Sequence, residues 1–284
     1  VKNTGMMMNL SHFFYGLSSM AAPLIAAYLM GIHWFGGTQI GWRGMYVIML
    51  SLALAPMVMA LFPRFPVSGG EGGERLSFAA YVRDPAAWWI IAILSFGVVS
   101  EMAIGGWLVN YLEKAYDWSL EKASGMLSLF FLFFMLARLV LGPVTDRIGY
   151  VRSLVIFSGA SGVCSIAAVF IGEPGAVLFA LAGIGIAPIY PTVMALLARR
   201  YAGSSDTAIT FTVTLMGIAT VLGNFLVGAI TDGFKSIFSG IYDAERGLVF
   251  GLQAGYLFIG LCALLCMVFS AYLLRYLGKR GEVL

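Results

Sequence analysis

Eight apolar runs, each about 20 residues long or longer, divide the 284-residue chain, and only short polar connections separate most of them. A helix of about 20 apolar residues crosses the hydrocarbon core of a bilayer, where helices or closed barrels alone satisfy every backbone hydrogen bond. Composition agrees, because 60% of the residues are hydrophobic and 11% are charged, against about 25% charged residues in soluble domains. The pattern predicts an all-α polytopic membrane protein with eight transmembrane helices, at 9–30, 43–62, 87–111, 123–144, 152–171, 176–197, 207–230 and 248–274.

Lysine and arginine are distributed unevenly between the two sides of these runs. The N-terminal end, the second, fourth and sixth connections and the C-terminal tail hold 11 of the 17 basic residues; the other four connections hold 5, and Arg138 lies within a helix. Cytoplasmic connections carry the excess of basic residues in membrane proteins. The distribution predicts a multi-pass protein of the cell inner (plasma) membrane with both termini of this chain, and the connection around Asp146, on the cytoplasmic side.

The fourth connection is the most distinctive stretch of the chain, and it reads R-L-V-L-G-P-V-T-D-R-I-G-Y-V-R from Arg138 to Arg152. Gly142 and Pro143 predict the end of the preceding helix, and Asp146 and Arg147 are predicted to occupy a tight turn. On residues alone, this could be an ordinary cytoplasmic turn of a helical hairpin, with Arg138 extending its charge to the membrane surface.

The spacing of this connection also resembles the signature loop of the major facilitator superfamily, G-x-x-x-D-R-x-G-x-x-R. That resemblance implies a secondary transporter with twelve helices in two six-helix halves, which moves its solute by alternating access. It further implies a gating role for the loop and for the arginine beside it. The gating candidates are Arg138, Gly142, Asp146, Arg147, Gly149 and Arg152.

In that superfamily the signature loop follows the second helix of a half, whereas four predicted helices precede it here. The resemblance therefore implies that 87–284 forms the complete C-terminal six-helix bundle and that 1–66 holds the last two helices of the N-terminal half. The stretch 67–86 would be the cytoplasmic linker between the halves, since proline and glycine are frequent from Pro63 to Gly73; 76–81 could form a short surface helix. We interpret the chain as an N-terminally truncated fragment whose partners include the missing helices of the same protein.

Glu101 is the one acidic residue placed deep within an apolar run. A carboxylate in the membrane costs several kcal/mol, so it is a candidate functional residue. Trp107 and Asn110 lie about 120° to 180° around the helix from it. Either the helix breaks at Gly105 and Gly106, or Glu101 pairs with another helix while Trp107 and Asn110 meet substrate. The run E-M-A-I-G-G-W-L-V-N-Y-L resembles the seventh helix of the fucose permease group, which implies a sugar substrate.

Two prolines interrupt the sixth predicted helix, in the run G-I-G-I-A-P-I-Y-P-T. Pro188 and Pro191 leave the carbonyls of Ile184 and Ala187 without their usual donors, and exposed backbone at membrane depth is tolerated where it lines protein or water. The break is predicted either to border the substrate path or to be satisfied by a neighbouring helix. The run resembles the tenth helix of the same sugar transporters.

Small and polar residues form a stripe along the seventh predicted helix, at Thr210, Thr214, Gly217, Asn224 and Gly228, within about 40° either side of Thr210. Such a stripe is typical of a water-filled path or of close helix packing. The residues predicted to contact substrate are Glu101, Trp107, Asn110, Tyr190, Thr192, Thr214, Asn224 and Gln253.

The sequence excludes several functions. No G-x-x-x-x-G-K-[ST] phosphate loop occurs, and the two histidines lie beside no acidic residue, so neither ATP, a cofactor nor a metal is predicted. We expect no enzyme and no nucleic-acid partner. The predicted function is secondary active transport of a small polar solute, a sugar, coupled to protons across the lipid bilayer. The alternatives are efflux of drugs or metabolites, and a non-transporting membrane scaffold or receptor.

Overall fold

The computed structural model describes residues 4–33, 38–62 and 78–282, and within these ranges almost every residue is helical. Eight segments are long and apolar enough to cross a membrane, which confirms the predicted all-α class and eight spans. The helices are α1 (Thr4–Gly31), α2 (Gly41–Met59), α3 (Phe78–Arg83), α4 (Pro85–Tyr116), α5 (Leu120–Ile148), α6 (Tyr150–Ile171), the 3-10 turn η1 (Glu173–Gly175), α7 (Val177–Ile186), α8 (Ile189–Arg200), α9 (Ser205–Ile241) and α10 (Ala244–Lys279).

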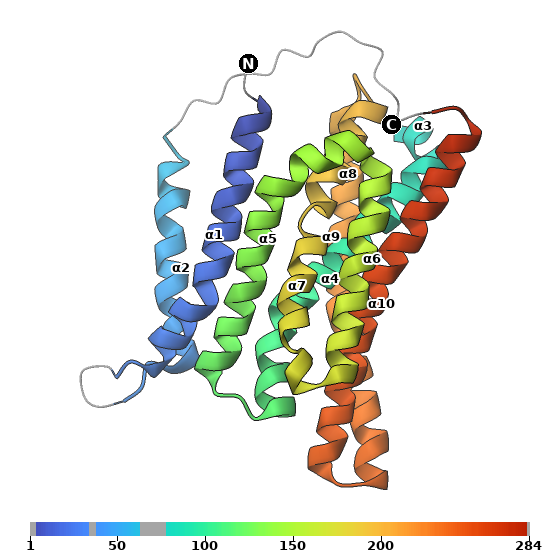
Figure 1. Cartoon of the computed structure of the whole chain (residues 1–284). Coiled ribbons are helices and arrows are strands. Elements are labelled where there is room, and N and C mark those ends of the chain that lie inside the picture. The colour runs from blue at the N-terminus through green and yellow to red at the C-terminus, as the bar shows by residue number, and fades with distance from the viewer. Residues whose placement is uncertain (1–3, 34–37, 63–77, 283–284) are drawn as a thin grey trace.

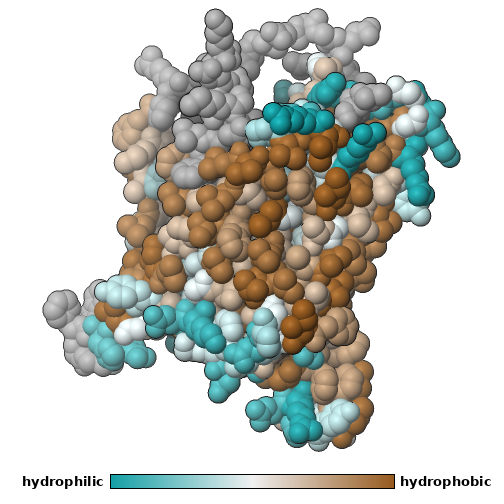
Figure 2. All heavy atoms as spheres, in the orientation of Figure 1, coloured by the Kyte–Doolittle hydropathy of each residue, from teal (hydrophilic) through white to brown (hydrophobic). Residues whose placement is uncertain are grey.

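Surface hydropathy agrees with a position across a bilayer. Figure 2 shows a broad band of apolar side chains around the middle of the bundle, with hydrophilic residues at both ends. Side chains such as Phe170 and Val221 are 75% and 72% exposed. Such exposure suits contact with lipid tails rather than with water. The protein is therefore a multi-pass membrane protein.

The helices from α4 to α10 contain six of the eight spans and form one packed group, the six-span group. Within it α10 packs against α4, α6 and α9 (Figure 1). Buried side chains form two clusters, one around Tyr111, Phe179 and Tyr256, and one around Tyr81 and Leu197. The first lies toward the C-terminal end of α4 and the second toward its N-terminal end, so apolar packing holds the group together at both ends.

Beside this group stand α1 and α2, and the main contact runs along α1 and α5 (Figure 1). A Cβ atom added to Gly16 of α1 would lie 2.9 Å from Cβ of Met135, so these two helices approach closely there because Gly16 has no side chain. None of the described residues of α2 is buried. The predicted flexible connector from Pro63 to Gly73 lies outside the described residues.

The short helix predicted in the linker is present, although it begins at Phe78 and ends at Arg83. It is not purely a surface helix, since Tyr81 is 1% exposed. The Tyr81 hydroxyl lies 2.7 Å from Oγ1 of Thr212 on α9. This buried tyrosine fixes α3 against the six-span group.

The predicted end of the helix before the signature loop was wrong. The helix before the signature loop does not end at Gly142, because α5 continues through Pro143 to Ile148 and includes Asp146 and Arg147 in its last turn. A proline there removes one helical hydrogen bond, a small loss near a helix end that water can reach. The chain reverses instead at Gly149, whose φ of 92° suits glycine.

The last two spans are also longer than predicted. Much of the predicted connection 231–247 is helical, since α9 ends at Ile241 and α10 begins at Ala244. Rings continue the pairing of the two helices beyond the apolar runs, with the Phe238 and Phe250 centroids 4.7 Å apart. The helix pair consequently projects from one end of the bundle (Figure 1).

The predicted interruption at Pro188 is present, but the predicted alternative at Gly105 and Gly106 is not. The chain leaves α7 at Ile186 and enters α8 at Ile189, whereas α4 is continuous from Pro85 to Tyr116. Proline removes a backbone donor, whereas glycine keeps it and can remain in a helix whose neighbours pack against it.

Candidate functional site

The deepest acidic side chain in the described part of the molecule is Glu101, which is 5% exposed. It lies near the middle of α4, about 24 Å from the first residue of that helix at about 1.5 Å per residue. The Tyr15 hydroxyl of α1 is placed to hydrogen-bond with its carboxylate, and the charge of Arg138 on α5 acts on it. Of the two alternatives that the sequence left open, pairing of Glu101 with other helices is the one present.

Arg138 directs its guanidinium into the protein. Its Nε donates a hydrogen bond of 3.1 Å to the carbonyl of Ala187, in the break between α7 and α8. The guanidinium carbon lies 4.1 Å from the ring centroid of Phe134 and 5.5 Å from that of Tyr15. Cations are attracted to aromatic ring faces. Tyr15, Glu101, Arg138 and the Ala187 carbonyl therefore form one cluster, the interface cluster, where α1 meets the six-span group.

Tyr15 was missed by sequence reasoning. It occurs in a helix rich in small residues, where nothing marks one tyrosine as a partner for a distant acid. The close approach of α1 and α5 at Gly16 and Met135 brings it to the cluster. The available signal was its position directly before the glycine that permits that approach.

A second set of predicted residues meets between α4 and α9. A Cβ atom on Gly228 would lie 3.6 Å from Cη2 of Trp107, and one on Gly106 would lie 4.0 Å from Oδ1 of Asn224. The Asn224 amide donates to the Thr220 carbonyl at 3.0 Å. Trp107 and Asn224 thus lie at one contact between α4 and α9, and their role in binding substrate stays a prediction.

The remaining predicted binding residues are dispersed. Asn110 is exposed, while Thr192 is 4% exposed within α8. The Gln253 side chain lies near the Tyr111 hydroxyl and acts on it, about 15 Å along α4 from Glu101. Tyr190 of α8 acts electrostatically on Arg138. Of these four, Tyr190 alone lies near enough to the interface cluster to act on Arg138.

Thr214 belongs to a different place. Its hydroxyl donates to the Thr210 carbonyl at 2.7 Å, and both threonines border a shallow cavity of about 410 Å³ with Phe78 of α3 and Asp206. The polar stripe of α9 is therefore divided, with one part facing this cavity and the other facing Gly106 and Trp107.

The signature loop lies at the surface. Asp146, Arg147 and Arg152 are exposed, and no hydrogen bond or ion pair joins the Asp146 or Arg147 side chain to another described residue. Over the same described ranges, no three His, Cys, Asp or Glu side chains gather as a metal site would require. The loop's gating role stays a prediction.

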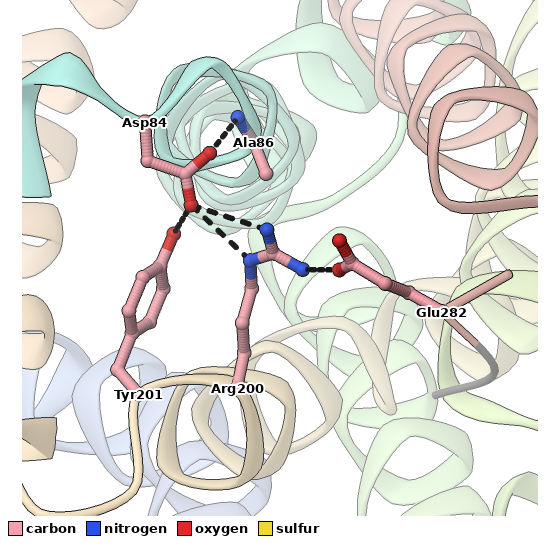
Figure 3. Close-up of polar contacts among 5 residues, drawn as sticks. All are labelled: Asp84, Ala86, Arg200, Tyr201 and Glu282. Atoms are coloured by element: carbon pink, nitrogen blue, oxygen red, sulfur yellow. Dashed lines mark hydrogen bonds and ion pairs between the residues drawn. The ribbon is translucent and has the colours of Figure 1, made fainter. Parts of the chain in front are cut away.

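A polar cluster that the sequence analysis overlooked joins three chain segments at the end of the bundle that holds α3 (Figures 1 and 3). Arg200 of α8 contacts Asp84, the N-cap of α4, and also Glu282 after α10. The Tyr201 hydroxyl donates to Asp84 at 2.7 Å. Asp84 directly before Pro85 is a helix-start signal that could have located part of this cluster.

Charge and burial set the proton affinities in this terminal cluster. Burial alone would raise the pKa of Asp84, but hydrogen bonds from Tyr201 and the Ala86 amide, with the charge of Arg200, outweigh it and lower that pKa below its usual value. Burial, together with the bond to Asp84, raises the pKa of the Tyr201 hydroxyl. Asp84 is thus held as a carboxylate and Tyr201 as a neutral donor.

Solved structures share this fold. The E. coli fucose:proton symporter FucP matches with a TM-score of 0.64 and 15% identity, over 93% of this chain and 68% of that protein. A bacterial homolog of the human lysosomal transporter Spinster, in an inward-facing conformation, matches with a TM-score of 0.65 and 12% identity, over 92% and 69% of the two chains.

Sequence comparisons agree with the fold. A TsgA homolog of Serratia proteamaculans is 23% identical over 225 residues, which are 76% of this chain and 54% of that protein. A TsgA homolog of Edwardsiella ictaluri matches with the same identity and coverage, so the chain spans about half the length of these curated relatives. The Major Facilitator Superfamily model, a family of transporters rather than enzymes, matches residues 1–224. With most of its length matched by that model, this chain belongs to the Major Facilitator Superfamily.

Proposed function

We propose that the full-length protein is a secondary active transporter that moves a sugar by alternating access and couples its movement to protons. The observation that carries the proposal is Glu101, buried in α4 between Tyr15 of α1 and Arg138 of α5. Ionisable residues at membrane depth are costly and mark ion or substrate paths. This one lies where two groups of helices meet.

Alternating access needs two bodies that move against each other around a site between them. We assign 87–284, from the third residue of α4 through α10, to the C-terminal body, and 1–66 with α1 and α2 to the other body, with 67–86 as the cytoplasmic linker. The seam along α1 and α5 supports this assignment, because these helices form the main contact between the two groups. Similar TM-scores against FucP in its outward conformation, 0.63, and against the inward-facing Spinster homolog, 0.65, are expected if most of this chain is one rigid body.

A sugar is the proposed substrate for two reasons. The fold is similar to that of the fucose:proton symporter FucP, and the chain carries side chains suited to binding a sugar. Sugars are bound by hydrogen bonds and by ring faces, and Trp107 and Asn224 offer one of each at the α4–α9 contact. Tyr190, which lies near Arg138 of the interface cluster, adds an aromatic hydroxyl. Asn110, Thr192, Thr214 and Gln253 remain weaker candidates on position alone.

The proposed orientation in the cell inner (plasma) membrane places both termini of this chain in the cytoplasm. The excess of basic residues in alternate connections supports it. The signature residues Gly142, Asp146, Arg147, Gly149 and Arg152 would then lie on the cytoplasmic side, where we propose that they gate the path.

Uptake of labelled sugars tests substrate and coupling together. The full-length protein is reconstituted into vesicles with an imposed proton gradient, and L-fucose and other labelled hexoses and pentoses are supplied; protein-free vesicles are the control. Accumulation that stops when a protonophore collapses the gradient is the expected result. Sugar uptake that survives collapse would keep the substrate and reject the coupling.

Two other results would replace the proposal. Expulsion of apolar dyes without sugar uptake would indicate an efflux transporter. Sugar binding in detergent with no flux of sugar or dye in vesicles would indicate a receptor or scaffold.

Glu121→Gln is the control for changes at Glu101. It alters an exposed carboxylate at the start of α5 and should leave sugar uptake unaltered.

A further inference from the structure

The break between α7 and α8 contains a backbone carbonyl that proline deprives of its helical donor. Ala187 would normally be bonded by the N–H of the residue four positions later, but that residue is Pro191. Ala187 is completely buried. An unpaired buried carbonyl is costly. Arg138 supplies the missing donor from another helix, through its Nε at 3.1 Å.

The same arginine has unused hydrogen-bonding capacity. Its Nη1 is buried and has no hydrogen-bond partner among the described residues. The groups that act on its charge are Glu101 from α4, Tyr15 from α1 and Tyr190 from α8. Glu101 is the only carboxylate among them, so the guanidinium stands between one acid and one helix break.

The helix that carries Glu101 also touches the break directly. Gly97, one turn before Glu101, would place a Cβ atom 2.7 Å from Cγ2 of Ile189, the first residue of α8. Since residues four apart share a helix face, the face of α4 that presents Glu101 lies against the start of α8. A change in the position or charge of Glu101 would therefore occur close to the start of α8.

We propose that Arg138 is a positioning residue that holds the α7–α8 break in place and transmits the charge state of Glu101 to it. This inference rests on the proposed role of Glu101 in proton coupling. With Glu101 ionised, attraction fixes the guanidinium and, through its Nε, the Ala187 carbonyl. When a proton from the aqueous side binds the carboxylate, that attraction ends, the bond to Ala187 is free to change, and α8 tilts relative to α7.

Arginine suits this role because its planar guanidinium donates from Nε and from both Nη atoms in fixed directions. It can therefore hold a carbonyl with one nitrogen while another faces an anion. Lysine keeps the positive charge but presents a single ammonium group. Arg138→Lys thus removes the several fixed donors of the guanidinium while it keeps the positive charge.

Pro191→Ala offers a complementary change that leaves both charges intact. Alanine restores the N–H that Ala187 lacks within its own helix, so the bond from Arg138 becomes unnecessary. The interruption at Pro188 remains, but its geometry should become independent of Glu101. Pro143→Ala, which restores an N–H inside α5 rather than in the α7–α8 break, is the matched control.

Pulsed electron paramagnetic resonance measures the distance between two spin labels placed on either side of the break. It requires no knowledge of the substrate. Labels at Val177 and Ala198, both exposed, lie roughly 30 Å apart at about 1.5 Å per helical residue. Cys164 is replaced by serine, while buried Cys262 and Cys266 are retained. The full-length protein in lipid nanodiscs is measured at about pH 4 and about pH 9, between which carboxylates in proteins titrate.

The expected wild-type result is a mean label distance that shifts by about 2 Å or more between the two pH values. Glu101→Gln should show the acidic distance at both. Arg138→Lys and Pro191→Ala should lose the shift, and Pro143→Ala should keep it. Because Pro191→Ala leaves both charges intact, it decides the matter even if Arg138→Lys fails to fold.

A pH-dependent shift that persists in Glu101→Gln, in Arg138→Lys or in Pro191→Ala would overturn the inference, as would a wild-type distance that does not respond to pH. Failure of this inference is distinct from failure of the proposed function. If this inference alone fails, proton-driven sugar uptake remains intact and dependent on Glu101. If the proposed function fails, the wild-type protein shows no proton-driven sugar uptake.

Discussion

Arg200 near the end of α8 donates two hydrogen bonds to one oxygen of Asp84, the N-cap of α4, from Nη2 at 3.2 Å and from Nε at 3.3 Å (Figure 3). The pair joins residues that are 116 positions apart in the chain. It ties the second part of the broken span to the start of the helix that carries Glu101. This contact should therefore contribute to the stability of the six-span group.

Arg200→Met tests that contribution. It leaves Asp84 with its bonds from Tyr201 and Ala86 but without a counter-charge, and Arg200 is only 12% exposed. Hydrogen bonds to charged groups are worth about 1.5–3 kcal/mol, so the free energy of unfolding in detergent should fall by about 2 kcal/mol. Arg246→Met is the control, because its ion pair with Asp243 is 70% and 58% exposed and should matter by less than about 1 kcal/mol. Equal effects of the two changes would contradict the account.

Asp84 should also make stability depend on acid pH. Its pKa is lowered in the folded protein, so the unfolded chain, with a pKa near about 3.9, binds the proton more tightly. The resulting stability is complete above that value and is lost as pH falls through the lower folded pKa. Unfolding midpoints of wild type and Asp84→Asn, compared from about pH 6 to about pH 2.5, should converge at the acid end. A constant difference would refute this assignment.

More of the fold than of the candidate site could be predicted from the sequence. The eight spans and the interruption at Pro188 follow from run length and from a missing N–H, which are local properties. Local reasoning failed at Pro143, where the rest of α5 and the polar end of the helix outweigh the loss of one hydrogen bond. It failed again after residue 230, where contacts such as that of Phe238 with Phe250 extend the helices beyond the apolar run.

The site depended on contacts between distant residues. Glu101 could be selected from its own sequence position, because an acid in an apolar run is conspicuous. Tyr15 could not, since its role depends on how closely α1 approaches α5. Gln253 looked available for substrate, yet the fold places it beside Tyr111. Periodicity identifies which residues share a face, but not which face of another helix they meet.

Glu101 and Arg138 should be coupled energetically. The two groups act on each other through their charges, so removing one leaves the other less well compensated. We expect Glu101→Gln and Arg138→Met each to lower the free energy of unfolding, and the double change to cost less than their sum by about 1 kcal/mol or more. Unfolding of the three variants in detergent gives this coupling energy. Additive effects would show that the two side chains act independently.

Glycine at position 183 should be required for the contact between α5 and α7. A Cβ atom there would lie 2.6 Å from the Phe130 carbonyl oxygen, a backbone atom that cannot move alone. Gly183→Ala should destabilise the protein by about 1–3 kcal/mol. Gly217→Ala on α9, where the added carbon would meet no described atom within 4 Å apart from the neighbouring backbone of its own helix, should be neutral or stabilising by up to about 1 kcal/mol. The reverse order in thermal unfolding would be inconsistent with this packing.

Accumulation and exchange of labelled sugar by Glu101→Gln test the central claim most directly. Glutamine resembles the protonated side chain but cannot release a proton. Vesicles containing the full-length variant should exchange internal for external sugar at a rate close to that of wild type, which shows that the protein is folded and binds. Under an imposed proton gradient, the same vesicles should not raise the internal sugar concentration above the external one. Proton-driven accumulation at the wild-type level would contradict the assignment of Glu101 as the coupling acid.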